Sequence, residues 1–444
     1  MKSSKRKICQ VLALAISSIS ASAAMAAGPL VQGGGSSLVA PTLGNISNTA
    51  TEIGLFGTSE ATFTYFSVGS GAGQNAFLSN APSFFGTGVT GTVDFANSDA
   101  ALTTAQVTNY NTTGLGSTQG PLIQIPYIVT AITIPVINAP AVTSTITPQT
   151  TPSQTHSISL NDHDLCGIFS GQIKDWNAVI NPETGSVYST TSKPITVVYR
   201  ADSSGTSELL TRHLAAVCPT AFVGGTVTFV DSLTFANTTA FPSGVPANFV
   251  GATGSGGVRT ALLALQSSSG APAAAAYLSP DYANTFLAPS SSSASPALAV
   301  ASLRNTTDGN YYAPIYQNAT TALGTVSAPS GSTAAADPTQ WVPVSGAAGS
   351  PYAKLANPAA GYPVSGTSQI IVSQCYLSSA VSKGVVDFLT DHYTNASFAS
   401  IVRGNGFDTV PTGFKTAIVA DFLSNSSGFG LDIGDTGVCG GAGR

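Results

Sequence analysis

The pattern of apolar and polar residues over the first hundred positions predicts strands that end in glycine-rich turns. Stretch 61–68 is rich in aromatic and β-branched residues and leads into Gly69, so we expect a strand, a tight loop and then a helix. A second such unit ends at 91–96 and is followed by the polar residues 97–99. Repeated units of this kind favour an α/β fold in which strand ends carry polar loops.

Longer apolar runs follow in the middle of the chain. Segments 122–129 and 131–136 are rich in β-formers and long enough to pass between two lobes, so we place the first crossing there. Segment 194–199 predicts a buried strand, and 208–217 has the apolar spacing of a helix with one buried face. A strand, a loop and a helix are therefore expected again in the second lobe.

The rest of the chain is expected to return to the first lobe. We place the return crossing near 275–278 and expect residues 286–367, rich in Ser, Ala, Pro and Thr, to form long surface loops. A strand at 370–372 and a helix at 381–392 would rejoin the first lobe. The predicted division is a signal peptide, a discontinuous lobe I and a continuous lobe II: 1–26, 27–127 with 277–444, and 128–276.

The N-terminal pattern indicates export. Basic residues precede an apolar stretch, 8–19, and small residues follow it up to Ala26, which is the order of a cleavable signal peptide. A spanning helix needs about 20 apolar residues, so we expect no membrane insertion. Cys9 precedes the apolar stretch, so it cannot serve as a lipoprotein anchor at the cleavage point. The expected location is the periplasm or the extracellular medium.

Composition and charge narrow the class of protein. Residues 1–26 hold four of the 15 lysines and arginines and none of the 20 acidic residues, so the mature chain carries a net charge of −9. A nucleic-acid partner is not expected for such a chain. Only 8% of the residues are charged, and the mature length exceeds one core. We expect at least two lobes and a monomer.

Four cysteines remain after export: Cys166, Cys218, Cys375 and Cys439. An even number in an exported chain predicts two disulfides, and four cysteines allow three pairings. We favour Cys166–Cys218 and Cys375–Cys439, because each pair would close a loop inside one lobe. A metal site is the alternative reading, but the chain has no C-x-x-C motif and no cluster of Cys and His.

The histidines and the short motifs give no sign of an enzyme. His156, His163, His213 and His392 are scattered, so we expect surface residues and no metal ligands, and only His163, between two aspartates, merits inspection. The chain lacks the nucleophile elbow G-x-S-x-G, the phosphate loop G-x-x-x-x-G-K and the zinc motif H-E-x-x-H. We therefore assign no catalytic residue, no metal and no cofactor.

The segment 199–206 carries the strongest chemical signal. Arg200 ends the predicted strand, and Ser204, Gly205 and Thr206 open the following helix. The first N–H groups of a helix lack partners within the helix and attract anions, while an arginine offers paired donors to an oxyanion. An ordinary helix cap beside a salt-bridged arginine is the other interpretation.

Two glycine-rich loops and one aspartate could complete an anion site. The loop 33–38 ends in Ser37 and Leu38, although on its own a flexible glycine-rich start is the favoured reading of it. Ser70 lies between two glycines, where a helix cap is the alternative to a ligand donor. Asp99 would repel an anion unless that anion carries a proton. Phosphate carries one near neutral pH and sulfate does not, so Asp99 could select phosphate. A turn or cap aspartate is the alternative.

Taken together, these loops resemble the phosphate-binding proteins that serve ABC transporters. Four further segments resemble the DING proteins, an exported branch of that superfamily: 165–171, 198–201, 341–344 and 373–376. The eponymous Asp-Ile-Asn-Gly start is replaced here by Leu-Val-Gln-Gly at 30–33, and Ser37 stands where the family has threonine. The resemblance covers nearly the whole mature chain.

The resemblance implies a fold and a ligand set. The fold would be a type II periplasmic-binding-protein fold, with two lobes, each a central β-sheet flanked by helices, and a cleft between them. The implied phosphate ligands are Ser37, the Leu38 N–H, Ser70, Asp99, Arg200, Ser204, the Gly205 N–H and Thr206.

The expected function is therefore capture of inorganic phosphate with discrimination against sulfate, for scavenging or for uptake through an ABC-transporter permease. Some relatives in this family are described as phosphatases, so a secreted phosphomonoesterase that uses Ser37 or Ser70 is the first alternative. An extracellular adhesion or matrix protein is the second.

Overall fold

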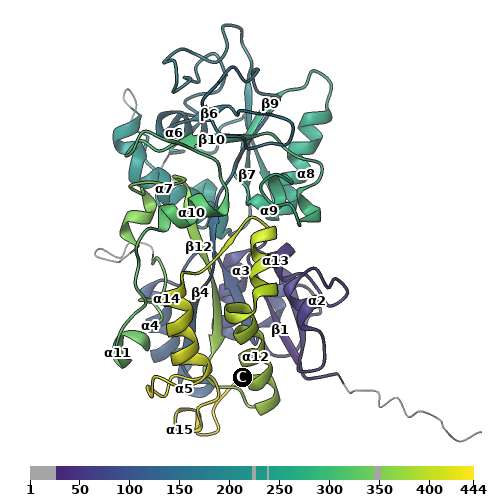
Figure 1. Ribbon diagram of the computed structural model, residues 1–444, viewed down its shortest axis with the longest axis vertical. Helices are drawn as coiled ribbons and strands as arrows, with labels where there is room; N and C mark the ends of the chain where they lie inside the picture. Colours follow the sequence, from purple (N-terminus) through teal and green to yellow (C-terminus); the bar gives the residue numbers. More distant parts are fainter. Residues whose placement is uncertain (1–26, 223–226, 238–239, 345–351) are drawn as a thin grey trace, which may run out of the picture.

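The computed structural model describes residues 27–222, 227–237, 240–344 and 352–444. The predicted signal peptide lies outside these residues. The described strands form two sheets, one in the upper and one in the lower half of Figure 1, and helices flank each sheet. This arrangement is the predicted two-lobed α/β architecture. In the described part of the chain, no helix is long and apolar enough to cross a membrane.

The sheet of lobe I has the strand order β13, β4, β12, β3, β1, β2. Its strands are β1 Leu30–Gly35, β2 Thr62–Ser67, β3 Phe95–Ser98, β4 Leu122–Ala131, β12 Ser365–Ser373 and β13 Asp408–Thr409. Helices of this half include α1 Ala40–Leu43, α2 Glu52–Phe56, α3 Ser70–Ser79, α4 Thr104–Thr112, α12 Ser379–Thr394, α13 Ala396–Gly404 and α14 Thr412–Ile418. β1 is parallel to β2 and β3, so the carboxyl ends of these strands meet at one edge.

The sheet of lobe II has the order β11, β10, β5, β9, β7, β8, with β6 paired to β10. Its strands are β5 Ile134–Ile137, β6 Ser159–Leu160, β7 Ile195–Arg200, β8 Phe249–Ala252, β9 Ala273–Ala276, β10 Val300–Arg304 and β11 Tyr311–Tyr312. The main helices beside it are α6 Asp162–Ser170, α7 Gly205–Ala221, α8 Gly254–Ser267 and α9 Pro280–Ala283. β7 is parallel to β8 and β9, so this sheet also has one edge of carboxyl ends.

Extended segments link the two sheets. β4 of the first sheet leads into β5 of the second, where the first crossing is expected. At this junction the Ile132 N–H donates to the carbonyl of Val364 over 2.8 Å, and Thr133 and Leu278 exchange backbone hydrogen bonds of 2.8 and 3.0 Å. Segments far apart in the sequence therefore lie side by side where the lobes meet.

Strand pairing differs from the predicted lobe boundary at 276/277. β10 is antiparallel to β5, with Val300 opposite Pro135, and β11 pairs with β10. Both strands therefore belong to the second sheet, because a strand joins the sheet that offers it a free edge, and sequence does not reveal that partner. We propose that lobe II extends through Tyr312 and that the chain returns between β11 and β12.

Segment 286–367 is more than the long surface loops expected from its composition. Besides β10 and β11 it contains α10, Tyr316–Leu323, which packs on β4. The side chains of Trp341 and Tyr362 are fully buried, and the Trp341 Nε1–H donates to the Ala335 carbonyl over 2.9 Å. A few large, buried side chains hold the segment against the core. The composition of the segment does not reveal them, because Ser, Ala and Pro are far more numerous.

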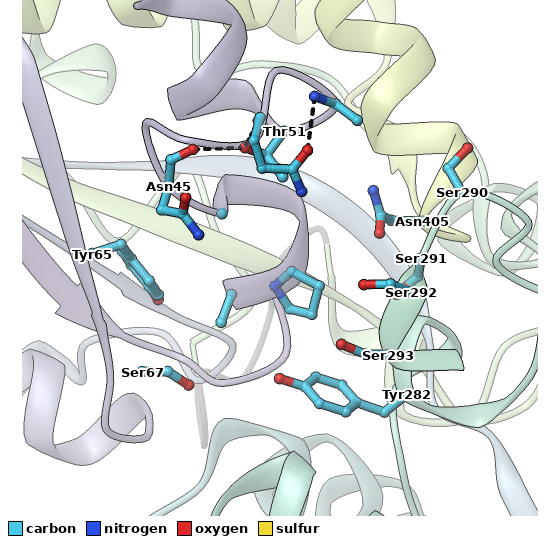
Figure 2. A pocket seen from close by; sticks show the side chains of 15 residues that line it. Asn45, Thr51, Tyr65, Ser67, Tyr282, Ser290, Ser291, Ser292, Ser293 and Asn405 are labelled. Carbon is cyan, nitrogen blue, oxygen red and sulfur yellow. Dashed lines mark hydrogen bonds between the residues drawn. The ribbon is translucent and has the colours of Figure 1, made fainter. Parts of the chain in front are cut away.

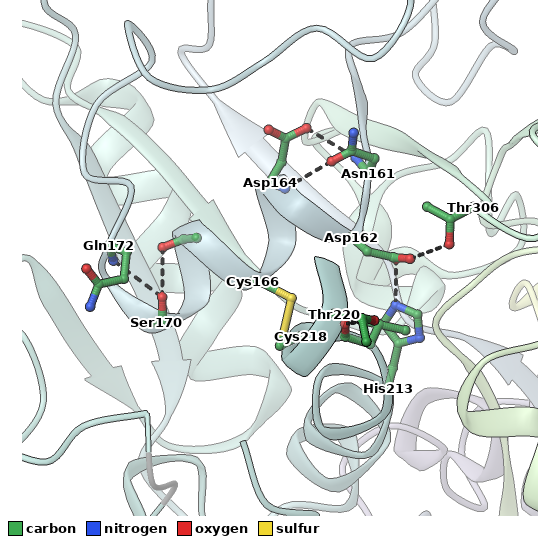
Figure 3. The surroundings of a disulfide bond; sticks show 12 residues. Asn161, Asp162, Asp164, Cys166, Ser170, Gln172, His213, Cys218, Thr220 and Thr306 are labelled. Carbon is green, nitrogen blue, oxygen red and sulfur yellow. Dashed lines mark hydrogen bonds and ion pairs between the residues drawn. A yellow bond between two sulfur atoms is a disulfide. The ribbon is translucent and has the colours of Figure 1, made fainter. Parts of the chain in front are cut away.

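The structure forms the two favoured disulfides, Cys166–Cys218 between α6 and α7 and Cys375–Cys439. Beside the first, His213 Nε2 lies 3.1 Å from Asp162 (Figure 3). Its Nδ1 lies 2.8 Å from the Ala356 carbonyl. The expectation of surface histidines is therefore wrong for His213. His392 is also buried, between the Glu52 carboxylate and the Tyr127 carbonyl, because such acceptors replace the water that a buried ring loses.

Candidate anion-binding site

The carboxyl ends of parallel strands from both sheets meet between the lobes, which is where open α/β sheets bind ligands. Ser37 follows β1, Ser70 opens α3 after β2, and Asp99 follows β3. From lobe II, Arg200 is the last residue of β7 and Gly205 the first of α7. These segments are in contact, because the Gly71 N–H donates to the Ser203 carbonyl over 3.2 Å.

Asp99 is a buried carboxylate whose two oxygens have different surroundings. Its Oδ1 accepts the hydroxyls of Ser36 at 2.6 Å and Ser368 at 2.8 Å. Among the residues that the structure describes, Oδ2 has only a long contact, 3.4 Å, from the Thr206 hydroxyl. Burial raises the pKa of Asp99, and the hydrogen bonds from Ser36 and Ser368 and the charge of Arg200 reduce that rise. Oδ2 therefore keeps a lone pair for a ligand proton.

Arg200 is held in one orientation by its neighbour in the same loop. Its Nε and Nη2 donate to the two oxygens of Asp202 over 2.7 and 2.5 Å, and 2% of its side chain is exposed. Burial alone would raise the pKa of Asp202, but the hydrogen bonds and the charge of Arg200 lower it. The remaining nitrogen, Nη1, lies 3.4 Å from the Ser255 hydroxyl. The fork is therefore fixed, and one nitrogen remains for a ligand.

Gly205 brings the start of α7 against lobe I. A Cβ atom at this position would lie 2.5 Å from the Ser70 hydroxyl and 2.6 Å from the Cβ of Asp99. Ser70 Oγ accepts the Asp99 N–H over 3.1 Å, which leaves the Ser70 proton for a ligand. Ser204 accepts the Ser207 N–H as the N-cap of α7, so its proton is also free. Glycine is needed at 205 for space rather than for backbone conformation.

The predicted ligand residues lie together in the structure, with one difference at Leu38. The Leu38 N–H, expected to face the ligand, donates over 3.1 Å to the Ser36 hydroxyl. Ser37 Oγ lies 2.9 Å from Ser255 Oγ and accepts the Ser255 N–H over 3.1 Å.

Sequence reasoning missed three site residues: Ser36, Ser255 and Ser368. A signal for Ser255 exists, because Gly254-Ser255-Gly256 after β8 repeats the Gly69-Ser70-Gly71 pattern after β2. Ser368 lies inside β12 at an irregular register and has no local signal.

A polar pocket of about 340 Å³ lies beside the β1 loop. Figure 2 shows Tyr65 and Ser67 on one side of it and Tyr282 on the other. None of the described residues that line it is charged. The Tyr65 hydroxyl donates to the Ser36 carbonyl over 2.7 Å, and burial, followed by the charge of Asp99, raises the pKa of Tyr65. The pocket therefore adjoins the Asp99 side of the site.

The arrangement of His, Cys, Asp and Glu side chains in the described residues gives no sign of a metal site. Over the described ranges, no group of three or more His, Cys, Asp and Glu side chains is arranged to hold a metal ion. His163, the histidine singled out from sequence, lies 3.8 Å from Asp164 and stacks on Phe222. Hydrogen bonding to Asp164 raises the pKa of His163. These contacts belong to the surface of α6 and not to the site.

Two sheets joined by crossing segments, with polar loops from both at the carboxyl ends of their strands, define a two-lobed solute-binding protein. A family model described as "PBP superfamily domain" matches residues 20–392. The chain belongs to the PBP superfamily and, within it, to the phosphate-binding proteins with DING-type structural neighbours.

Relatives and solved structures support that placement. A "Phosphate-binding protein" from an unknown prokaryotic organism is 37% identical, with 86% of this chain and 93% of that protein covered. "Alkaline phosphatase L" of Pseudomonas aeruginosa is 35% identical, with 86% of this chain and 88% of that protein covered. The subatomic-resolution structure of a high-affinity periplasmic phosphate-binding protein, PfluDING, with bound phosphate matches with a TM-score of 0.72 and 33% identity over 93% of this chain and 99% of that one.

Proposed function

We propose that this chain captures hydrogen phosphate between its lobes. The observation that carries the proposal is Asp99, an acceptor with one free carboxylate lone pair, surrounded by donors. The proposed ligands are those implied by the resemblance: Ser37, Leu38, Ser70, Asp99, Arg200, Ser204, Gly205 and Thr206. Hydroxyls, the N–H groups of helix N-termini and Nη1 of Arg200 would bind three phosphate oxygens, and Asp99 would accept the proton on the fourth.

The same carboxylate would discriminate against sulfate. Sulfate has no proton to donate, so its oxygen and Asp99 Oδ2 would face each other as two buried, unpaired acceptors. Leaving a buried acceptor unpaired costs about 1–3 kcal/mol, and more when the groups are charged. Selectivity would therefore come from a penalty on the wrong anion.

The proposed setting is outside the cytoplasm. The N-terminal pattern, the two disulfides and a structural neighbour described as periplasmic support export. We also propose an ABC-transporter permease as a partner, which the resemblance implies, and a monomer as the working form.

Calorimetric titration tests the proposal. The mature protein, unfolded and refolded without reductant to remove copurified ligand, would be titrated with phosphate and then with sulfate. Tight one-to-one binding of phosphate and a weak response to sulfate are expected. Correctly refolded protein that binds neither anion would refute the proposal.

A phosphomonoesterase is the second candidate, favoured by the "Alkaline phosphatase L" relatives and by one contact. Ser37 contacts Ser255, and Ser70 contacts the Asp99 backbone, whereas the Ser36 hydroxyl donates to the Asp99 carboxylate over 2.6 Å. Ser36 is therefore the better nucleophile, with Asp99 as its base.

In that reaction a bond would form from Ser36 Oγ to phosphorus while the ester P–O bond breaks. Asp99 would pass the serine proton to the leaving alcohol, and water would then release phosphate from the serine. Turnover of an aryl phosphate that Ser36→Ala abolishes would establish the activity. Equal turnover in both proteins would assign it to another group or to a contaminant.

A further inference from the structure

Ser255, in the first turn of α8, belongs to lobe II but contacts a proposed ligand in each lobe. Its N–H donates to Ser37 Oγ over 3.1 Å, and its Oγ lies 2.9 Å from the same atom. Its Oγ also lies 3.4 Å from Arg200 Nη1. Ser255 is fully buried, so these contacts are shielded from water.

The donors in this group fix the direction of two of the three hydrogen bonds, those that Arg200 Nη1 and the Ser255 N–H donate. An arginine nitrogen only donates, so Ser255 Oγ accepts from Arg200 and keeps its own proton to donate. Ser37 Oγ already accepts the Ser255 N–H. If Ser255 also donates its hydroxyl proton to Ser37, both lone pairs of Ser37 are used, and its only proton must point to another acceptor.

We infer that Ser255 is a positioning residue for phosphate, the middle member of a relay from Arg200 through Ser255 to the Ser37 hydroxyl. The inference rests on the proposed function. Each bond in such a chain polarises the next, so the Ser37 proton becomes a stronger donor than that of an isolated hydroxyl. Ser255 would act through Ser37 and need not touch the ligand.

The α8 turn is also held from the Asp202 side. The Gly254 N–H donates to Asp202 Oδ1 over 3.0 Å, and the same oxygen accepts from Arg200 Nε. Gly254 has φ +69°, a left-handed conformation that favours glycine. One loop therefore places Ser255 and orients Arg200 together, so the relay is available when the lobes are closed.

The test is a double-mutant cycle on phosphate affinity with Ser37→Ala, Ser255→Ala and the double variant. We expect Ser255→Ala to weaken binding about tenfold and the double variant to be no weaker than Ser37→Ala alone, because Ser255 acts through Ser37. Ser255→Thr, which keeps the hydroxyl, should recover most of the affinity. Thr260→Ala, on the exposed face of the same helix, is the matched control.

Different results refute different statements. Wild-type affinity in Ser255→Ala, or additive losses in the cycle, would overturn the relay while phosphate binding by the wild type stands. A wild-type protein without phosphate binding would overturn the proposed function and the relay with it. If Ser255→Ala does not fold, Ser255→Cys replaces it in the cycle, because a thiol has nearly the size of the hydroxyl but is a weak donor. A loss of affinity that disappears in the Ser37→Ala background supports the relay, and equal losses in both backgrounds overturn it.

Discussion

Gly205→Ala is expected to block closure of the lobes without disturbing either lobe. Gly205 is the first residue of α7, and its φ lies outside the left-handed region, so the local backbone accepts alanine. Alanine also has the higher helix propensity. The new Cβ would instead meet Ser70 Oγ at 2.5 Å, Asp99 Cβ at 2.6 Å and the Ala100 nitrogen at 2.7 Å, all in lobe I.

These contacts are about 1 Å shorter than the roughly 3.5 Å at which carbon atoms pack. Two of the three are backbone or Cβ atoms, which cannot rotate away, so the lobes must separate. Overpacking of this kind costs about 1–3 kcal/mol, or roughly 5- to 150-fold in phosphate affinity. The Thr206–Asp99 contact, already 3.4 Å long, would open with it.

Calorimetry should therefore show weaker phosphate binding at an unchanged melting temperature, and small-angle scattering should show a more open molecule in the presence of phosphate. Gly413→Ala is the control, because its Cβ would meet no atom within 4 Å on an exposed face of α14. Wild-type affinity in Gly205→Ala would show that the lobes do not approach each other at this residue when phosphate binds.

Four further predictions follow from the charges. Asp99→Asn should lower the ratio of phosphate affinity to sulfate affinity. Acid should lower the same ratio in the wild type, because the Asp99 carboxylate stops accepting a hydrogen bond from phosphate as the pH falls through its raised pKa. A ratio that is unchanged in both titrations would show that Asp99 does not discriminate between the anions. Arg200→Ala should abolish phosphate binding, measured by calorimetry, and leave a cooperative melting transition; unchanged affinity would place Arg200 outside the site. Burial raises the pKa of Asp94 to about 6, so ionised Asp94 should cost the folded state up to about 3 kcal/mol, a cost absent below pH 4 and complete above pH 6. Thermal melts of wild type and Asp94→Asn should therefore diverge between pH 4 and 6, and parallel curves would contradict the assignment. Phosphate affinity measured between 50 and 500 mM salt should change little, and a steep loss would show that long-range charge dominates.

Much of the fold was predictable because its signals are local. The strand that ends at Arg200 and the helix that begins at Gly205 follow from apolar spacing and turn residues within ten positions. The place of β10, Val300–Arg304, could not be predicted from local signals. It joins the second sheet through antiparallel pairing with β5, which lies more than 150 positions away in the sequence. Pairing of distant strands depends on which edge is free, and no local pattern encodes it.

The site residues also differ in whether a local sequence signal marks them. Arg200 and Ser70 could be proposed from sequence because Ser70 lies between two glycines and Arg200 ends a predicted strand that leads into a serine-rich turn. Ser368 could not, because it reaches the Asp99 carboxylate from a strand 269 positions away. His392 was misjudged for a similar reason, since its acceptors on Glu52 and Tyr127 come from other elements. Contacts between distant segments decide whether a polar residue is buried, and a single sequence does not display them.

Charge alone would not draw phosphate into this site. Arg200 is matched by Asp202, and Asp99 adds a second carboxylate, so the fixed side-chain charges disfavour an anion. In the proposed site, favourable binding would come from oriented dipoles at contact: the first turns of α3 and α7 and the hydroxyls around them. The role of Asp202 is then to orient the Arg200 guanidinium through two hydrogen bonds. On the proposed function, such a site would recognise where an anion carries its proton and its oxygens, a distinction between phosphate and sulfate that net charge cannot make.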